Sequence, residues 1–122
     1  MTQRIYLAGP MTGLPNLNFP AFHAEAARLR TLGYDVISPA ELPHAANNLV
    51  FETPEEYFAH WQKCMRLDLL EMLTCDSVAM LDGWTASRGA SLEHRVALDL
   101  GLNPRLASFF VERPVAGEGG AK

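Results

Sequence analysis

Short apolar runs alternate with helical segments along this chain, and that alternation limits its fold more than any other feature. Runs of strand length lie at 4–8, 34–38, 77–81 and 105–111. Segments with apolar residues at helical spacing lie at 20–32, 54–73 and 89–100. This order predicts an α/β fold: a doubly wound parallel sheet of four to five strands with helices on both faces, a flavodoxin-like or Rossmann-like three-layer sandwich.

The length and composition suit a single domain. The chain has 122 residues, of which 48% are hydrophobic and 20% are charged, so it can bury one core. We expect an α/β domain at 1–112 and a flexible, Gly-rich C-terminal tail at 113–122. No signal-peptide pattern precedes the first strand, and no apolar stretch approaches the ~20 residues that span a bilayer. We therefore expect a cytoplasmic protein without a membrane partner.

Charge and cysteine content restrict the ligands. The formal net charge is -4 and the ten basic residues are scattered, which argues against binding to a nucleic acid polymer. A small anionic ligand is compatible with this charge, because backbone amides can bind phosphate. Cys64 and Cys75 stand eleven residues apart without a nearby His pair, so we expect reduced thiols in the core and no metal site. Nothing in the sequence implies an organic cofactor.

The loops that follow the predicted strands are the places to look for a ligand. In doubly wound sheets, ligands bind beyond the carboxyl ends of the strands, where the strand order reverses. The first such loop contains Gly9, Pro10 and Met11, and its glycines would let the backbone approach a sugar or a phosphate. An ordinary structural turn would explain the same residues.

The segment after the third apolar run is the other candidate. Asp82 and Trp84 lie in this loop, and the Trp84 ring could stack on a base or simply pack against the protein. The next helix opens with Ser87 and Gly89, where free amides and hydroxyls could hold an anion. Ordinary N-capping by Ser87 is the competing interpretation.

One carboxylate borders an apolar stripe in the helix predicted at 54–73. The stripe consists of Phe58, Trp61, Met65, Leu69 and Met72. Asp68 lies at its edge, where burying an acid is costly unless the acid is paired or functional. The alternative is a boundary residue paired with Arg66 or another surface cation.

A second carboxylate stands in the helix predicted at 89–100. Glu93 precedes Val96, Ala97 and Leu100 by three, four and seven residues, and we expect those three to define the buried side. Glu93 would then face the ligand crevice, although a first-turn Glu is also favoured simply by the helix dipole. The next residue, His94, would point elsewhere, towards the surface.

Two carboxylates beside one crevice suit the cleavage of a glycosidic bond. The reaction passes through an oxocarbenium-like state that one carboxylate can stabilise or trap covalently. The second can position the sugar or move a proton to the leaving base. Tyr6, on the first strand, would need a hydrogen-bond partner if buried, and a nearby carboxylate would serve.

Four segments together resemble the nucleoside 2-deoxyribosyltransferase-like superfamily, over residues 4–111. They are Ile5-Tyr6-Leu7-Ala8-Gly9-Pro10, Arg66-Leu67-Asp68, Leu73-Thr74-Cys75-Asp76-Ser77-Val78 and Gly89-Ala90-Ser91-Leu92-Glu93. The opening Tyr-Leu-Ala-Gly-Pro-Met-Thr-Gly is most similar to a small, often phage-associated branch of uncharacterised proteins. The superfamily contains transferases that exchange bases between deoxynucleosides and hydrolases that cut nucleoside or deoxynucleoside 5′-monophosphates.

The resemblance implies roles for individual residues. Glu93 would be the nucleophile at C1′, Asp68 would bind the sugar or assist the leaving base, and Tyr6 would orient Glu93. Residues near the sugar or a 5′-phosphate would be Gly9, Ser87 and Gly89. The substrate would be a small-molecule nucleoside or nucleotide, and the chain would assemble as a homodimer or larger homo-oligomer. One departure stands out, because Arg95 occupies the position of a Gly that commonly follows the nucleophile in the transferases.

The sequence therefore predicts an enzyme that cleaves the N-glycosidic bond of a (deoxy)nucleoside or its 5′-monophosphate, by hydrolysis or by base exchange. Two alternatives stay open. A catalytically silent nucleotide-binding or sensing module could share the same residues. A phosphoribohydrolase of the cytokinin-activating type also places Glu one turn into a helix that a Gly starts.

Overall fold

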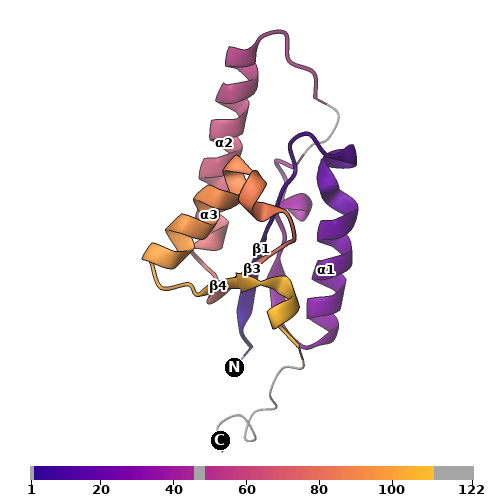
Figure 1. The fold of residues 1–122 in the computed structure, drawn as a ribbon, viewed down its shortest axis with the longest axis vertical. Coiled ribbons are helices and arrows are strands. Elements are labelled where there is room, and N and C mark those ends of the chain that lie inside the picture. The colour runs from indigo at the N-terminus through magenta and orange to yellow at the C-terminus, as the bar shows by residue number, and fades with distance from the viewer. Residues whose placement is uncertain (1, 46–48, 112–122) are drawn as a thin grey trace, which may run out of the picture.

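The computed structural model describes residues 2–45 and 49–111 and confirms the predicted alternation of strands and helices (Figure 1). The strands are β1 (Arg4–Ala8), β2 (Asp35–Ile37), β3 (Ser77–Met80) and β4 (Pro104–Leu106). The helices are α1 (Phe19–Thr31), α2 (Pro54–Met72) and α3 (Arg88–Asp99). Short 3₁₀ helices lie at η1 (Pro15–Asn18), η2 (Pro39–Glu41), η3 (Trp84–Ala86) and η4 (Ala107–Phe109).

The four strands form one parallel sheet in the order β2-β1-β3-β4. The chain runs from β1 to its neighbour β2, then crosses back through α2 to β3 on the opposite side of β1. The strand order therefore reverses between β1 and β3. Their carboxyl ends are the place where a doubly wound sheet binds a ligand.

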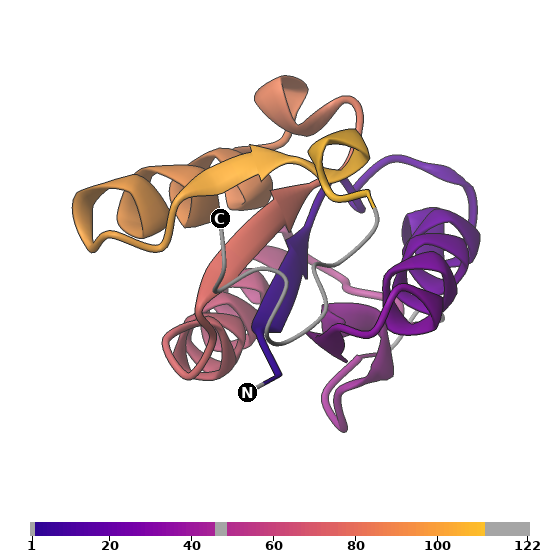
Figure 2. The same cartoon turned by 90° about the horizontal axis from the view of Figure 1, so that it is seen from below.

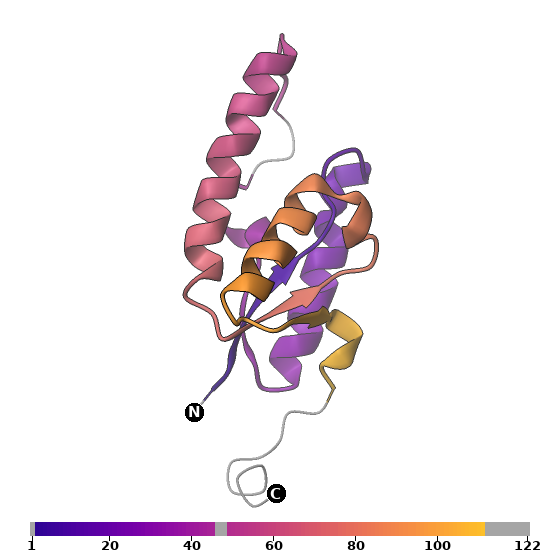
Figure 3. The same ribbon diagram turned by 60° about the vertical axis from the view of Figure 1, so that its left-hand side comes forward.

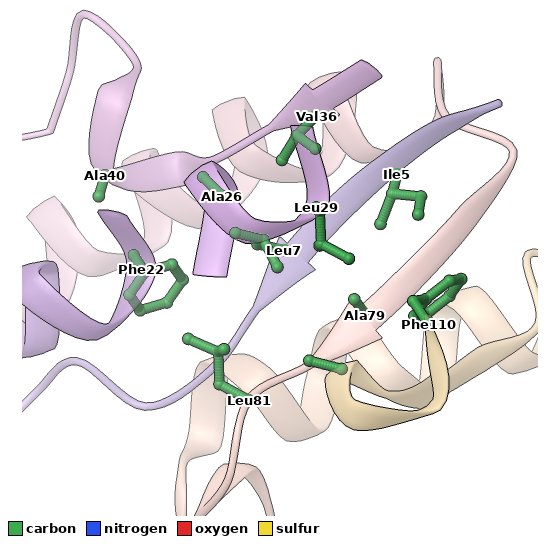
Figure 4. Packing of buried hydrophobic residues seen from close by; sticks show 11 residues of the cluster. Ile5, Leu7, Phe22, Ala26, Leu29, Val36, Ala40, Ala79, Leu81 and Phe110 are labelled. Atoms are coloured by element: carbon green, nitrogen blue, oxygen red, sulfur yellow. The ribbon is translucent and has the colours of Figure 1, made fainter. Parts of the chain in front are cut away.

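Alternating side chains of β1 divide the core into two layers. Ile5 and Leu7 pack against α1, whereas Tyr6 and Ala8 pack on the side of α2 and α3. Figure 2 shows α1 on one face of the sheet and the other two helices on the opposite face. The close-up in Figure 4 shows Leu7 beside Phe22 and Leu29 in the α1 layer. This arrangement is the predicted three-layer sandwich.

Helix α2 is longer than the sheet that it covers. Its start is fixed by a capping box, in which Thr53 Oγ1 accepts from Glu56 N and the Glu56 carboxylate accepts from Thr53 N. Figure 3 shows the N-terminal half of the helix extending past the carboxyl ends of the strands. The apolar stripe of this half therefore has no sheet beneath it, and it forms a wall above the strand ends.

The C-terminal part of the sheet differs from the prediction. The strand expected at 105–111 is only Pro104–Leu106, and the chain then turns through η4. The Arg28 guanidinium donates hydrogen bonds to the carbonyl oxygens of Ala107 and Phe110, at 2.8 and 2.9 Å. These bonds hold the turn against α1 and bury Phe110, so the segment cannot continue as a strand. The described residues contain no fifth strand.

Leu100 is exposed and not buried, because α3 ends at Asp99 and its buried side consists of Ala90, Glu93 and Ala97. The predicted tail at 113–122 lies outside the described residues, so the domain boundary stays a prediction.

Candidate active site

A cleft of about 820 Å³ lies at the carboxyl ends of β1 and β3. Its walls come from the loop after β1, from one side of α2 and from the segment between β3 and the first turns of α3. The predicted site residues that line it are Gly9, Pro10, Met11, Asp68, Asp82, Ser87, Gly89 and Glu93. The fold thus brings residues from three distant parts of the chain to the strand-order reversal.

Close packing at the end of β1 fixes the floor of the cleft. Gly9 leaves the strand so near to β3 that an added Cβ would lie 2.8 Å from Cβ of Leu81. Any side chain at this position would push the two strand ends apart. A similar approach occurs at Gly89, where an added Cβ would lie 3.1 Å from Sδ of Met65. The glycine lets the start of α3 pack tightly on α2.

Glu93 and Tyr6 form a buried hydrogen-bonded pair beside the cleft. The Tyr6 hydroxyl donates to Oε2 of Glu93 at 2.6 Å, and Glu93 is only 4% exposed. Burial raises the pKa of Glu93 to about 8; the Tyr6 hydrogen bond opposes this rise, and the charge of Asp68 adds to it. Burial and the Glu93 charge raise the pKa of Tyr6 well above its usual range, so the phenol stays a donor. Among the described residues, Oε1 of Glu93 has no hydrogen-bond donor, which leaves that oxygen for a ligand.

Asp68 is paired with a histidine that the sequence analysis missed. Nε2 of His44 lies 2.6 Å from Oδ1 of Asp68, and both side chains are largely buried. The alternative partner Arg66 makes no ion pair with Asp68, which corrects that expectation. Burial raises the pKa of Asp68, and the His44 contact partly offsets the rise. Nothing local in the sequence points to His44, because the loop after β2 brings it across to α2.

The start of α3 is capped as an ordinary helix. Ser87 Oγ accepts a hydrogen bond from Ala90 N at 3.1 Å, which supports the N-cap interpretation of Ser87. The backbone N–H groups of Arg88 and Gly89, at the first two helical positions, have no partner inside the helix. They lie on the lining of the cleft, so N-capping and anion binding are compatible here.

Trp84 does not belong to the cleft, contrary to the sequence-based expectation. Its ring stacks on His94 with the centroids 4.2 Å apart and the planes 17° apart. Gly83 adopts φ 84°, and the 3₁₀ turn that follows carries Trp84 towards the α3 layer of the core. The stack also makes His94 half-buried and not a surface residue. Of the two interpretations of Trp84, the structure therefore agrees with packing against the protein.

The aromatic residues that line the cleft belong to α2. Tyr57, Phe58 and Trp61 line the cleft, although the sequence pattern assigned Phe58 and Trp61 to the core-facing stripe. The stripe is real, but this half of the helix extends past the sheet. Its aromatic rings therefore face the cleft and not the core. Cys64, expected as a core thiol, is also half-exposed at the cleft, whereas Cys75 is buried.

A smaller chamber of about 380 Å³ adjoins the cleft on the far side of Asp68. Asp68, Trp61 and Tyr57 line both spaces, while His44 and Phe51 belong to the smaller one. The Thr12 and Tyr57 hydroxyls are hydrogen-bonded at 2.9 Å, which links the loop after β1 to the projecting half of α2. The carboxyl group of Asp68 therefore stands between a chamber that contains Glu93 and a mainly apolar side chamber.

Comparison with known proteins agrees with this architecture. A family model described as "Domain of unknown function (DUF4406)" matches residues 3–104. The chain belongs to the DUF4406 family. No curated protein matches the sequence of this DUF4406 member.

Two solved structures resemble the fold of this DUF4406 chain. One is the 2-deoxyribosyltransferase of Bacillus psychrosaccharolyticus, with a TM-score of 0.58 and 24% identity over 84% of this chain and 70% of that protein. The other is a conserved protein of Enterococcus faecalis V583, with a TM-score of 0.53 and 21% identity over 85% of this chain and 62% of that protein. The nucleoside 2-deoxyribosyltransferase-like fold predicted from the sequence is thereby confirmed.

Among residues 2–45 and 49–111, no helix is both long and apolar enough to cross a membrane. Within the same ranges, no three His, Cys, Asp or Glu side chains are grouped so that they could hold a metal ion.

The raised pKa of Glu93 predicts a specific dependence of stability on pH. The ordinary pKa of a Glu side chain in the unfolded chain is near 4.5, and the folded value is about 8. Between these values the folded state holds a proton that the unfolded state has lost, so stability falls as pH rises towards 8. Glu93→Gln removes this titration. We expect its melting temperature to exceed that of the wild type by several degrees at pH 8.5 and by much less at pH 5.

Thermal melts of both proteins across that pH range measure the difference. Glu55→Gln, an exposed glutamate in the first turn of α2, is the matched control and should follow the wild type at every pH. A difference between Glu93→Gln and wild type that does not change between pH 5 and 8.5 would contradict the buried, protonated Glu93.

Proposed function

We propose that this protein cleaves the N-glycosidic bond of a nucleoside or nucleotide, with Glu93 as the nucleophile. The observation that carries the proposal is the pairing of Glu93, which lines the cleft, with Tyr6, which is fully buried behind it. Within residues 2–45 and 49–111, this buried carboxylate accepts one hydrogen bond on one oxygen and none on the other, an arrangement that supports a role as nucleophile. The confirmed fold supports nucleoside chemistry at the level of the superfamily.

In this proposal, ionised Glu93 attacks C1′ of the sugar from the cleft side. The C1′–N bond breaks as the Glu93–C1′ bond forms. The sugar carries positive charge in the oxocarbenium-like transition state, and the carboxylate stabilises that charge. The Tyr6 hydroxyl keeps Oε2 in place while Oε1 reacts. Water, or a nitrogen of a second base, then attacks C1′; the Glu93–C1′ bond breaks and the Glu93 carboxylate is restored. The attacking water or base loses a proton, which returns to the carboxylate that protonated the first base, and the product is the free sugar or a new nucleoside.

The departing base needs a proton, and the Asp68–His44 pair can supply it. Asp68 lies between the two chambers, and its raised pKa favours the protonated form of the carboxyl group. The sugar would lie beside Glu93 in the large chamber, and the base would lie towards the apolar side chamber. The base would then leave past Asp68, with His44 orienting that carboxyl group through the 2.6 Å contact.

The remaining predictions from the sequence complete the proposal. The partner is a small-molecule nucleoside or nucleotide, the chain forms a homodimer or larger homo-oligomer, and the protein acts in the cytoplasm. The silent sensing module stays an alternative, because a binding pocket and a catalytic pocket can use the same residues. A phosphoribohydrolase would also cleave an N-glycosidic bond. The identity of the substrate that turns over distinguishes this alternative from the main proposal.

A base-release assay tests the proposal directly. Purified protein is incubated with common ribo- and deoxyribonucleosides and their 5′-monophosphates, with and without a second free base, and released base is measured by chromatography. We expect wild-type turnover and a loss of roughly three orders of magnitude or more in Glu93→Gln, because the nucleophile is gone.

Glu55→Gln should keep the wild-type rate. Binding of the reactive substrate to Glu93→Gln, measured by calorimetry, should persist. Binding without any release by the wild type would favour the sensing module over the enzyme.

The Tyr6–Glu93 bond predicts how pH controls the reaction. The Tyr6 hydrogen bond lowers the pKa of Glu93, so Tyr6→Phe should raise that pKa further and shift the rising limb of the pH–rate profile to higher pH. A hydrogen bond to a charged group contributes about 1.5–3 kcal/mol, which corresponds to about a 10- to 100-fold loss of rate at neutral pH. A uniformly lower profile without a shift would mean that Tyr6 serves only the packing of the core.

A further inference from the structure

One cation lines a cleft that otherwise carries only acidic charge. Among the described lining residues, the charged side chains are Asp68, Asp82, Glu93 and Arg88. None of these three acidic side chains offers positive charge to an anionic substrate, so a phosphorylated ligand needs a cation from elsewhere on the lining. Arg88 is the one arginine or lysine on this lining.

The Arg88 side chain extends from the start of α3 to the projecting half of α2. It is the first residue of α3, and its Cζ lies over the rings of Phe58 and Trp61, 4.8 Å from each centroid. The two rings stack on each other with their planes 11° apart. The aromatic surface therefore holds a long, otherwise flexible side chain in one place.

The way Arg88 is held leaves its donors available. Arg4, Arg28, Arg30 and Arg95 each pair with a carboxylate in the described structure. Arg88 makes no such pair among the described residues, and attraction to an aromatic ring does not consume N–H donors as a carboxylate does. A guanidinium with free N–H groups matches the fork of oxygens on a phosphate.

The spacing along α3 agrees with a nucleotide. Arg88 precedes Glu93 by five residues, which is about 7.5 Å of helical rise. The 5′-phosphate of a nucleotide also lies several ångströms from C1′, on the far side of the sugar. With C1′ at Glu93, a sugar oriented with its 5′ side towards the start of α3 would bring the phosphate within the span of the Arg88 side chain, since both residues line the same cleft.

We propose that Arg88 binds the 5′-phosphate of the substrate and makes nucleoside 5′-monophosphates the preferred substrates over unphosphorylated nucleosides. This inference rests on the proposed function and identifies the residue that sets substrate class. The competing explanation is a structural clasp, meaning that Arg88 only packs on Phe58 and Trp61 and so stabilises the contact between α3 and α2.

The experiment compares kcat/KM for a nucleoside 5′-monophosphate and for its parent nucleoside. We expect the wild type to prefer the monophosphate, and Arg88→Gln to lower that preference about 10- to 100-fold, mainly through KM for the monophosphate. Arg88→Lys should recover part of the preference, because it retains the charge without the fork. Inorganic phosphate should inhibit the wild type more strongly than Arg88→Gln.

Arg95→Gln is the matched control, since Arg95 lies on the same helix, pairs with Asp99 and does not line the cleft. It should keep the wild-type preference. An Arg88→Gln variant whose preference equals that of the wild type would overturn the inference, and so would an equal loss for both substrates, which is the outcome of a structural clasp. Thermal melts establish that each variant is folded.

Failure of the proposed function would be distinguishable from failure of this inference. If no substrate releases its base, calorimetric binding of the monophosphate and the nucleoside to wild type and Arg88→Gln decides the question. Tighter wild-type binding of the monophosphate, lost in Arg88→Gln, would retain the phosphate site in a protein that does not turn over. Equal binding of both ligands would overturn it.

Discussion

The burial of a carboxylate between a strand and a helix is the constraint on which the site depends. Glu93 sits in the layer between β1 and α3, where a charged group is costly unless it is protonated or paired. Tyr6 donates a hydrogen bond that offsets part of this cost, and it does so from the middle of the sheet. The two residues are 87 positions apart, so the bond exists only when β1, β3 and α3 are assembled. The position of the proposed nucleophile therefore depends on the folded core.

The second constraint is the length of α2. Its C-terminal half covers the sheet in the usual way, while its N-terminal half extends past the strand ends and becomes a wall of the cleft. That wall includes Phe58 and Trp61, whose rings make cation–π contacts with the guanidinium of Arg88. A single helix thus supplies both part of the core and part of the proposed binding surface, and Asp68 lies where the two parts meet.

Sequence reasoning was most informative where a residue conflicted with its surroundings. Glu93, Asp68 and Tyr6 carry polar groups at positions where the pattern requires apolar ones, so the conflict was visible without coordinates. His44 and Trp84 show the limit of this approach, because their contacts depend on loop paths that no periodicity encodes. The turn at Gly83 sends Trp84 into the core, and the loop after β2 carries His44 to α2. The fourth strand was overestimated for a related reason, since the bonds from Arg28 that end it come from a distant helix.

Trapping the covalent intermediate tests the central claim most directly. A nucleoside or nucleotide analogue with 2′-fluorine slows the breakdown of a glycosyl–carboxylate ester, because the fluorine destabilises the oxocarbenium-like state. After incubation and acid quenching, intact-mass and peptide mass spectrometry would locate any added sugar. The account predicts an adduct of the sugar mass on the peptide that contains Glu93, and none in Glu93→Gln. Base release without an adduct, or an adduct on another residue, would contradict Glu93 as the nucleophile.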